Sequence, residues 1–200
     1  MASRFSHWMN GDDASDEIGL QLQGDGATES FSTTGATDFF VDPADGRTVA
    51  NGAFHYREVS GDVSLTAAVT PSFSATYDAG ALLAWIDDTH WAKLAFEFTD
   101  MGFPAVVSVV TREYSDDANG QRIDEPSVRL RLSRRGSLWA LHWQPVTQDR
   151  PWYMLRYFRM GAPTDAVRLG LLVQSPTGTG CRATFTDIVV GDAPEDMRAG

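Results

Sequence analysis

The sequence contains a single cysteine, Cys181, so no disulfide bond can form within the chain. No histidine lies near it in the sequence, which indicates a structural thiol and not a nucleophile. No hydrophobic run approaches the roughly 18 residues that a membrane-spanning helix needs. The segment Met1–Trp8 also lacks the apolar stretch of a secretory signal peptide. We therefore expect a cytoplasmic protein.

Basic residues are scarce, and lysine is almost absent. The chain has 16 basic and 27 acidic residues, which gives a formal net charge of −11. Because nucleic acids and anionic membranes are themselves negative, this balance argues against both as partners. Lys93 is the only lysine, and the other 15 basic residues are arginines. Lys93 is therefore a candidate for a role that arginine does not fill.

Several chemistries lack their usual sequence signals. The four histidines are scattered without paired spacing, so a zinc site is not expected. The pairs Asp87-Asp88 and Asp116-Asp117 lack the spacing and terminal glutamate of a calcium loop and are interpreted as turns. No phosphate-binding glycine-rich loop, nucleophile elbow or basic stripe is present. We expect neither a metal nor a cofactor.

Short apolar or alternating runs recur along the chain, separated by glycine, proline, aspartate and asparagine. This spacing predicts about eleven strands in a sandwich or barrel. The expected strands are Ile18–Gln23, Ala53–Glu58, Val63–Thr70, Ala81–Ile86, Trp91–Phe98, Ala105–Arg112, Val128–Ser133, Leu138–Trp143, Tyr153–Phe158, Val167–Gln174 and Thr184–Val190. Turn residues at 87–90 and 100–104 predict an antiparallel meander over 81–112. The polar segment Asp116–Gln121 is interpreted as the longest loop.

No linker divides the 200 residues, which are enough for one domain. We expect a single β-sandwich over residues 1–200 with its core at about 5–190. The polar tail Gly191–Gly200 is expected to fray.

The segment Trp91–Phe98 alternates strictly, which is typical of a β-strand with two different faces. The apolar face, expected to lie between the two sheets, carries Ala92, Leu94, Phe96 and Phe98. The opposite face, expected to lie outside that core, carries Trp91, Lys93 and Glu97. Lys93 and Glu97 are about 13 Å apart along an extended strand, so each needs partners from neighbouring strands.

A set of short motifs follows the order found in one family. The motifs are Tyr77-Asp78-x-Gly80, Trp91-x-Lys93-x-x-x-Glu97, Ser108-Val109-Val110-Thr111, Ser115-Asp116, Trp152-x-x-x-Arg156, Gly170-Leu171 and Ser175-Pro176-x-Gly178. The chain thus resembles the family of unknown function that is similar to the yeast "regulation of enolase" protein, over residues 5–190. Asp38-Phe39-Phe40, Phe54 and Phe185 also resemble family positions. The resemblance implies an all-β, concanavalin A-like jelly-roll sandwich of two curved antiparallel sheets, and it implies no known reaction.

Two positions depart from the family pattern. The family tends to place tryptophan after Ser-Asp, where this chain has Asp117. It also tends to carry Asp-Gly shortly before the Trp-x-x-x-Arg motif, where this chain has Asp149-Arg150. Both departures fall in presumed loops, so they concern the details of a ligand and not the fold.

The face of Trp91 combines an aromatic ring with charged groups, as a ligand pocket requires. Trp91 would stack on a sugar or similar ring, while Lys93, Glu97 and an arginine bind its polar groups. The candidate ligand-binding residues are Tyr77, Asp78, Trp91, Lys93, Glu97, Thr111, Arg129, Trp152 and Arg156. We expect Lys93, Glu97 and Arg156 to converge on one concave pocket. The alternative is that the charges form cross-strand ion pairs that only fix register.

Glycoside hydrolysis needs two suitably spaced carboxyl groups, and no such pair lies on the strand of Glu97. The sequence therefore favours a lectin-like protein that binds a carbohydrate or a small polar metabolite on the concave face. One alternative is a protein–protein module that modulates a metabolic enzyme. A second is an uncharacterised enzyme that uses Lys93, Glu97 and Arg156. A broad apolar patch would favour the module, and a buried lysine beside a carboxylate at a cavity would favour the enzyme.

Overall fold

The computed structural model describes residues 5–11, 27–147, 151–161 and 166–199, and these residues form fifteen β-strands. The strands are β1 (His7–Met9), β2 (Ala27–Thr34), β3 (Phe39–Val41), β4 (Thr48–Ala50), β5 (Ala53–Ser60), β6 (Val63–Ser72), β7 (Ala79–Asp87), β8 (His90–Phe98), β9 (Pro104–Arg112), β10 (Tyr114–Arg122), β11 (Val128–Arg135), β12 (Leu138–Pro145), β13 (Tyr153–Arg159), β14 (Ala166–Gln174) and β15 (Gly180–Gly191). No helix in this part of the chain is long and apolar enough to cross a membrane.

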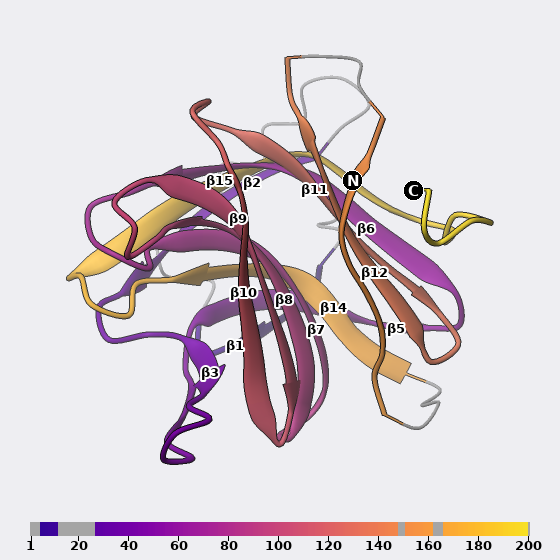
Figure 1. The fold of residues 1–200 in the computed structure, drawn as a ribbon, viewed down its shortest axis with the longest axis horizontal. Coiled ribbons are helices and arrows are strands. Elements are labelled where there is room, and N and C mark those ends of the chain that lie inside the picture. The colour runs from indigo at the N-terminus through magenta and orange to yellow at the C-terminus, as the bar shows by residue number, and fades with distance from the viewer. Residues whose placement is uncertain (1–4, 12–26, 148–150, 162–165, 200) are drawn as a thin grey trace.

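The strands form two large antiparallel sheets. One has seven strands in the order β1-β5-β14-β7-β8-β9-β10, and the other has six in the order β13-β12-β11-β6-β15-β2. Figure 1 shows the two layers, with β15, β2 and β6 in one and β7 to β10 curving below them. The fold is the expected jelly-roll sandwich, and β7, β8 and β9 form the expected antiparallel meander.

The main hydrophobic core lies between the two sheets. Leu94 and Phe96 of β8 belong to it, together with residues of the other sheet such as Leu65 and Leu130, and all four are fully buried. The predicted division of β8 into two faces is therefore confirmed, because Trp91, Lys93 and Glu97 lie outside this core. Phe98 differs from the expectation. It is only partly buried at the strand end, where its ring meets the ring of Phe73 at 6.0 Å.

A short hairpin, β3–β4, covers the other face of the seven-stranded sheet and makes a second hydrophobic cluster there. Phe39 and Val41 of the hairpin pack with Trp85 and Trp91, whose rings stack at 4.8 Å. The interpretation of Trp91 as an exposed platform is therefore wrong, since its side chain is 0% exposed. Burial of a whole indole removes a large apolar area from water, and this stabilises the hairpin on the sheet.

Residues Asp116–Gln121, predicted as a loop, belong to strand β10 instead. This strand lies at the edge of its sheet and pairs only with β9. An edge strand has little need for an alternating apolar pattern, because polar side chains there remain in contact with water. The short strands β1, β3 and β4, and the serine- and threonine-rich β2, were also missed. The expected strand Ile18–Gln23 lies outside the described residues.

The tail does not fray as expected in its described part. Ala193 and Met197 pack against Ala140 of β12, and the guanidinium of Arg135 donates to the Glu195 carbonyl at 2.8 Å. Cys181 is buried, and burial raises the pKa of its thiol to about 12. A thiol that holds its proton so tightly is a poor nucleophile, as the sequence indicated.

Candidate functional site

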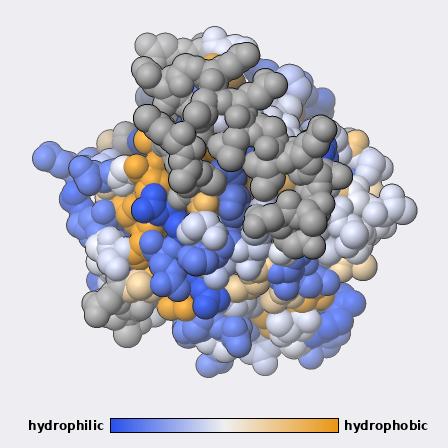
Figure 2. All heavy atoms as spheres, turned by 180° about the vertical axis from the view of Figure 1, so that it is seen from behind, coloured by the Kyte–Doolittle hydropathy of each residue, from blue (hydrophilic) through white to orange (hydrophobic). Residues whose placement is uncertain are grey.

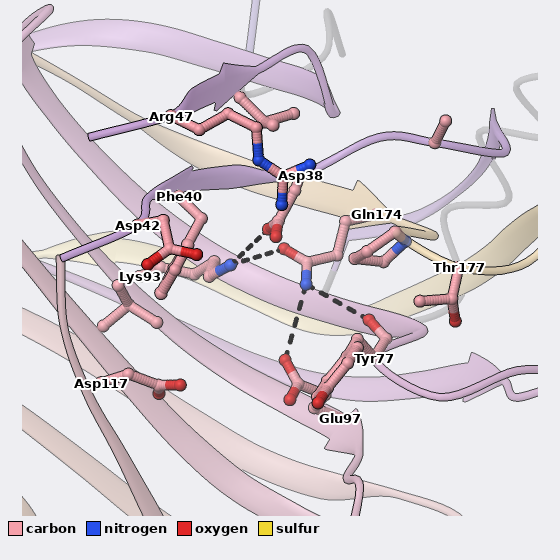
Figure 3. A pocket seen from close by; sticks show the side chains of 14 residues that line it. Asp38, Phe40, Asp42, Arg47, Tyr77, Lys93, Glu97, Asp117, Gln174 and Thr177 are labelled. Atoms are coloured by element: carbon pink, nitrogen blue, oxygen red, sulfur yellow. Dashed lines mark hydrogen bonds and ion pairs between the residues drawn. The ribbon is translucent and has the colours of Figure 1, made fainter. Parts of the chain in front are cut away.

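A cavity of about 680 Å³ lies on the seven-stranded sheet, on the face turned away from the inter-sheet core. Its lining comes from β8, β9, β10, the end of β14, the turn before β7, and the segment 36–49 that contains the hairpin. This volume is typical of pockets that bind small molecules. The close-up in Figure 3 shows polar side chains from these separate elements pointing into one space.

Cross-strand register explains why particular polar residues meet in the cavity. Lys93 of β8 pairs with Val109 of β9, which in turn pairs with Asp117 of β10. Glu97 stands two rows away on the same face, four residues along β8, with the row of Ala95 between them. Directly opposite residues in a sheet share one face, so a polar side chain in such a row points into the same cavity.

Lys93 is held by two partners although only 2% of its side chain is exposed. Its ammonium donates to Oδ1 of Asp38 at 2.8 Å and to Oε1 of Gln174 at 2.7 Å. Asp38 stands just before β3, and Gln174 ends β14. The ion pair therefore ties the hairpin to the sheet, and it balances a charge that would otherwise be costly to bury.

Gln174 links the two charged positions of β8. Glu97 pairs with Ala79 of β7, and Ala79 pairs with Gln174, so all three belong to one row. The Gln174 amide nitrogen donates to the Tyr77 carbonyl at 3.2 Å and makes a long contact of 3.5 Å with Oε2 of Glu97. Figure 3 shows the resulting chain of contacts from Asp38 through Lys93 and Gln174 to Glu97.

Burial changes the protonation of Glu97. Desolvation, reinforced by the negative charges of Asp38, Asp117 and Asp100, raises the pKa of Glu97 to about 8, although Lys93 acts in the opposite direction. The carboxyl group is therefore mostly protonated at neutral pH, and it can both donate and accept a hydrogen bond. A neutral carboxylic acid beside an ion pair gives the cavity floor a nearly balanced charge.

We expect the stability of the protein to fall as the pH rises from about 4.5 to about 8 because of Glu97. The folded state binds this proton up to about pH 8, because the pKa of Glu97 is raised there, while the unfolded carboxyl has its ordinary pKa of 4.5, so deprotonation favours unfolding. Between about pH 6 and about pH 8 this single group should cost roughly 2 kcal/mol of unfolding free energy. Urea unfolding at both pH values measures the loss.

Glu97→Gln should remove most of this pH dependence, because glutamine stays neutral at both pH values. Glu58→Gln is the matched control, since Glu58 is an exposed carboxylate on β5. An equal fall in stability for the wild type and Glu97→Gln would contradict the assignment of the raised pKa.

Asp117, the residue that departs from the family pattern, lines the cavity from β10. Partial desolvation raises the pKa of Asp117, Lys93 lowers it, and the negative charge of Asp38 raises it again. Asp42 and Arg47 of the hairpin also line the cavity. The outer part of the cavity is therefore charged, whereas its floor is close to neutral.

Apolar side chains complete the lining. Phe40, Val49, Val109 and Pro176 supply them, and Tyr77 adds an aromatic ring that is 37% exposed. Apolar surface beside a few converging polar groups is the usual composition of a site for a small polar ligand. In the described part of the chain, no three His, Cys, Asp or Glu residues are arranged to hold a metal ion.

Two further predicted residues shape the cavity without lining it. Asp78 is fully buried, and its carboxylate accepts hydrogen bonds from the backbone and hydroxyl of Ser74, from the Ala75 backbone and from the Ser175 hydroxyl. It thereby fixes the turn that presents Tyr77. Thr111 shares a hydrogen bond of 2.8 Å with Ser115, whose hydroxyl accepts the backbone N–H of Val41 in the hairpin.

The remaining predicted residues lie elsewhere. Arg129 contacts Asp187 at 3.4 Å in the six-stranded sheet, and the ring of Trp152 stacks under the guanidinium of Arg131. Arg156 does not line the cavity, so the expected convergence of Lys93, Glu97 and Arg156 is not found. Its guanidinium instead binds the carbonyl and carboxylate of Asp116, next to Asp117.

Sequence reasoning missed Asp38, Gln174 and the hairpin residues that face the cavity. Asp38 is 55 positions from Lys93, and Gln174 is 81 positions from it, so no local pattern joins them. A weak signal existed at Gln174, where a polar residue ends the apolar run of β14. Asp38 likewise belongs to the Asp-Phe-Phe segment that resembles a family position.

Solved structures share this fold at low sequence identity. A functionally unknown protein from Saccharomyces cerevisiae matches with a TM-score of 0.81 and 22% identity, over 94% of this chain and 96% of its own. The xylan β-1,4-xylosidase from Bacillus halodurans C-125 matches with a TM-score of 0.63 and 11% identity, over 86% of this chain but only 34% of its own. The alginate lyase from Klebsiella pneumoniae matches with a TM-score of 0.53 and 12% identity, over 84% of this chain and 82% of its own.

Sequence comparison places the chain in a family. No curated protein matches it significantly. The family described as "Protein of unknown function (DUF1349)" matches residues 21–193. This match covers every strand of the two large sheets except β1, and it includes every residue that lines the cavity. The chain therefore belongs to the DUF1349 family of proteins of unknown function.

Proposed function

We propose that the protein is a lectin-like binding protein that takes a carbohydrate or a small polar metabolite into the cavity beneath the β3–β4 hairpin. The observation that carries this proposal is the composition of one cavity of about 680 Å³. The polar contacts of Lys93, Gln174 and Glu97 line the same cavity as the apolar groups of Phe40, Val109 and Tyr77. Sugars present hydroxyl groups together with apolar C–H faces, so both parts of this lining have partners on such a ligand.

The named neighbours support a relation to carbohydrates. A xylan β-1,4-xylosidase and an alginate lyase share the fold, although this chain spans about a third of the xylosidase. Figure 2 adds a point against the protein–protein alternative for the face that it shows. The coloured residues there are mostly hydrophilic or neutral, and the hydrophobic ones form narrow bands instead of one broad patch.

Phe40→Ala should weaken binding of the ligand by about tenfold or more, because the ring supplies apolar surface at the cavity. The wild type is first screened by thermal shift against neutral sugars, sugar acids and central metabolites, since a ligand that binds only the folded state raises the melting temperature. Titration calorimetry with each hit then gives the dissociation constants of both proteins.

Tyr153→Ala is the matched control for this experiment. Tyr153 is an exposed aromatic residue on β13 in the other sheet, and its removal should leave the dissociation constant unchanged. The proposal fails if no compound raises the melting temperature, or if both variants weaken binding equally.

An enzyme is a second candidate, because a buried lysine beside a carboxylate at a cavity is the arrangement that would favour one. Lys93 is buried beside the Asp38 carboxylate at a cavity, and Glu97 and Asp117 bring two more carboxyl groups into the same cavity from different strands. A protonated Glu97 is suited to donate a proton, and an ionised Asp117 is suited to accept one. Mass spectrometry of each bound compound after incubation distinguishes the two candidates, since only an enzyme changes its ligand.

A further inference from the structure

The charges of the cavity are not spread evenly. Among the described lining residues, four carry carboxyl groups, namely Asp38, Asp42, Glu97 and Asp117, and two are cationic, namely Lys93 and Arg47. Their positions divide them into an inner and an outer group. The inner group is buried on the sheet around Lys93 and Glu97, and the outer group of Asp42, Arg47 and Asp117 is closer to solvent.

The inner group has little capacity left for a charged ligand. The Lys93 ammonium lies 2.8 Å from an Asp38 oxygen, so its charge is compensated, and two of its three N–H donors are already used by Asp38 and Gln174. Glu97 is 6% exposed, and burial favours its neutral form. The floor therefore offers hydrogen-bond donors and acceptors without a net charge.

The outer group is acidic. Asp42 and Asp117 outnumber the one lining cation of this group, Arg47. The nearby Arg156 is already paired with the Asp116 carboxylate, and the whole chain carries a net charge of −11. An anionic ligand must pass this rim and then meets no uncompensated cation on the floor. Juxtaposed like charges disfavour binding strongly, and the acidic surroundings also slow the approach of an anion.

A cationic ligand fits the rim but not the floor. Once it enters, its charge lies beside the Lys93 ammonium, while the nearest floor carboxylate, Asp38, is already paired with that ammonium. No carboxylate in the described floor is both ionised and free of a cationic partner. The floor consequently disfavours a positive group as well as a negative one.

We propose that the ligand of this cavity is a neutral polyhydroxylated compound, such as an uncharged mono- or oligosaccharide, and that the acidic rim rejects sugar acids and sugar phosphates. This inference rests on the proposed function and adds the chemical class of the ligand. A hydroxyl group donates and accepts one hydrogen bond at once, which matches a floor built from an ammonium, an amide and a protonated carboxyl.

The test uses matched series of ligands that differ only in charge. Glucose, glucuronate, glucose 6-phosphate and glucosamine form one series, and further series start from each neutral sugar that raises the melting temperature. The full chain is titrated with each compound at about pH 7 and low salt. We expect the neutral member of the binding series to bind about tenfold or more tightly than its acidic and phosphorylated members.

Two additional measurements assign the selectivity to the rim. Asp117→Asn should reduce the ratio of the acidic to the neutral dissociation constant at least about threefold, and raising the salt concentration should reduce it too, because salt screens exposed charges. Asp187→Asn is the matched control. It removes one exposed carboxylate from the other sheet, asparagine tolerates the positive φ of 52° at that position, and the ratio should not change.

The titrations have three outcomes that would contradict the proposals. Tighter binding of an acidic, phosphorylated or amino member than of its neutral counterpart overturns the neutral-ligand inference and leaves the proposed binding function intact. Absence of binding by every member of every series overturns the neutral-ligand inference, and the proposed function falls as well if no central metabolite raises the melting temperature. An unchanged ratio in Asp117→Asn, with neutral sugars still preferred, contradicts the role assigned to the rim.

Discussion

Phe96→Ala is expected to lower the free energy of unfolding by about 3–5 kcal/mol, as truncation of a buried aromatic residue usually does. The Phe96 side chain is 0% exposed in the core between the two sheets, and its ring meets that of Phe73 edge-on at 5.2 Å. The variant loses the transfer free energy of the ring, and it also leaves a cavity that the two sheets fill only in part. Urea unfolding followed by tryptophan fluorescence measures the difference.

Phe98→Ala is the matched control, because it makes the same chemical change two residues further along the same strand face. Phe98 is only partly buried at the end of β8, so its truncation should cost less than about 1.5 kcal/mol. If the two variants lost similar stability, or if Phe96→Ala lost less than about 1 kcal/mol, the assignment of the inter-sheet core would be wrong.

The contrast between these two phenylalanines shows how far the sequence predicts the fold. The period of two in β8 predicted both faces of the strand, because successive side chains must point to opposite sides of a sheet. It placed Phe96 and Phe98 on the same face, which is correct. It did not show that the core ends before Phe98, since the extent of a core depends on the strands of the opposite sheet.

An edge strand, β10, was the longest strand that the sequence failed to predict. β10 reads Tyr-Ser-Asp-Asp-Ala-Asn-Gly-Gln-Arg, and nothing in that composition predicts a strand. The strand forms because β9 offers backbone partners along most of its length, and most of its polar side chains remain in contact with water. Asp117 consequently stands in a sheet facing the cavity, whereas the sequence placed it in a loop.

The site was predicted in part, for the same reason. Lys93 and Glu97 were found because charges on a strand with one apolar face stand out in the pattern. Trp91 shares that face and was misread, because a three-residue strand, β3, covers it and no periodic signal reveals so short an element. Asp38 and Gln174 reach Lys93 through the fold alone, so their roles required the structure.

Lys93→Met is expected to cost about 3 kcal/mol of stability and to weaken ligand binding, because it leaves the Asp38 carboxylate without its cationic partner and the Gln174 side-chain oxygen without the ammonium donor. The value lies at the low end for a broken buried pair, since the Asp38 side chain is 20% exposed and water compensates part of its charge. Urea unfolding and titration with the hit from the thermal-shift screen give the two quantities.

Lys93→Arg tests whether a positive charge at position 93 is sufficient for wild-type stability and ligand binding. The lysine side chain is only 2% exposed, so a larger, planar guanidinium must displace its neighbours, and overpacking of this kind costs about 1–3 kcal/mol. We expect the variant to fold with reduced stability and to bind the ligand more weakly than the wild type. Wild-type stability and affinity in Lys93→Arg would show that the position tolerates any cation.

The double variant Lys93→Met/Asp38→Asn separates the ion pair from the packing around it. Asparagine keeps an acceptor for the Phe39 backbone N–H, which donates to Oδ1 of Asp38 at 2.7 Å, but it removes the charge that Lys93→Met leaves unpaired. The double variant should therefore lose at least about 1 kcal/mol less than the sum of the two single losses, as expected for residues in direct contact. Strict additivity would mean that Lys93 and Asp38 do not stabilise one another. In that case the hairpin would be held by its hydrophobic contacts with Trp91 and Trp85 and by the hydrogen bond from Val41 to Ser115, and the ion pair would not explain the balanced charge of the cavity floor.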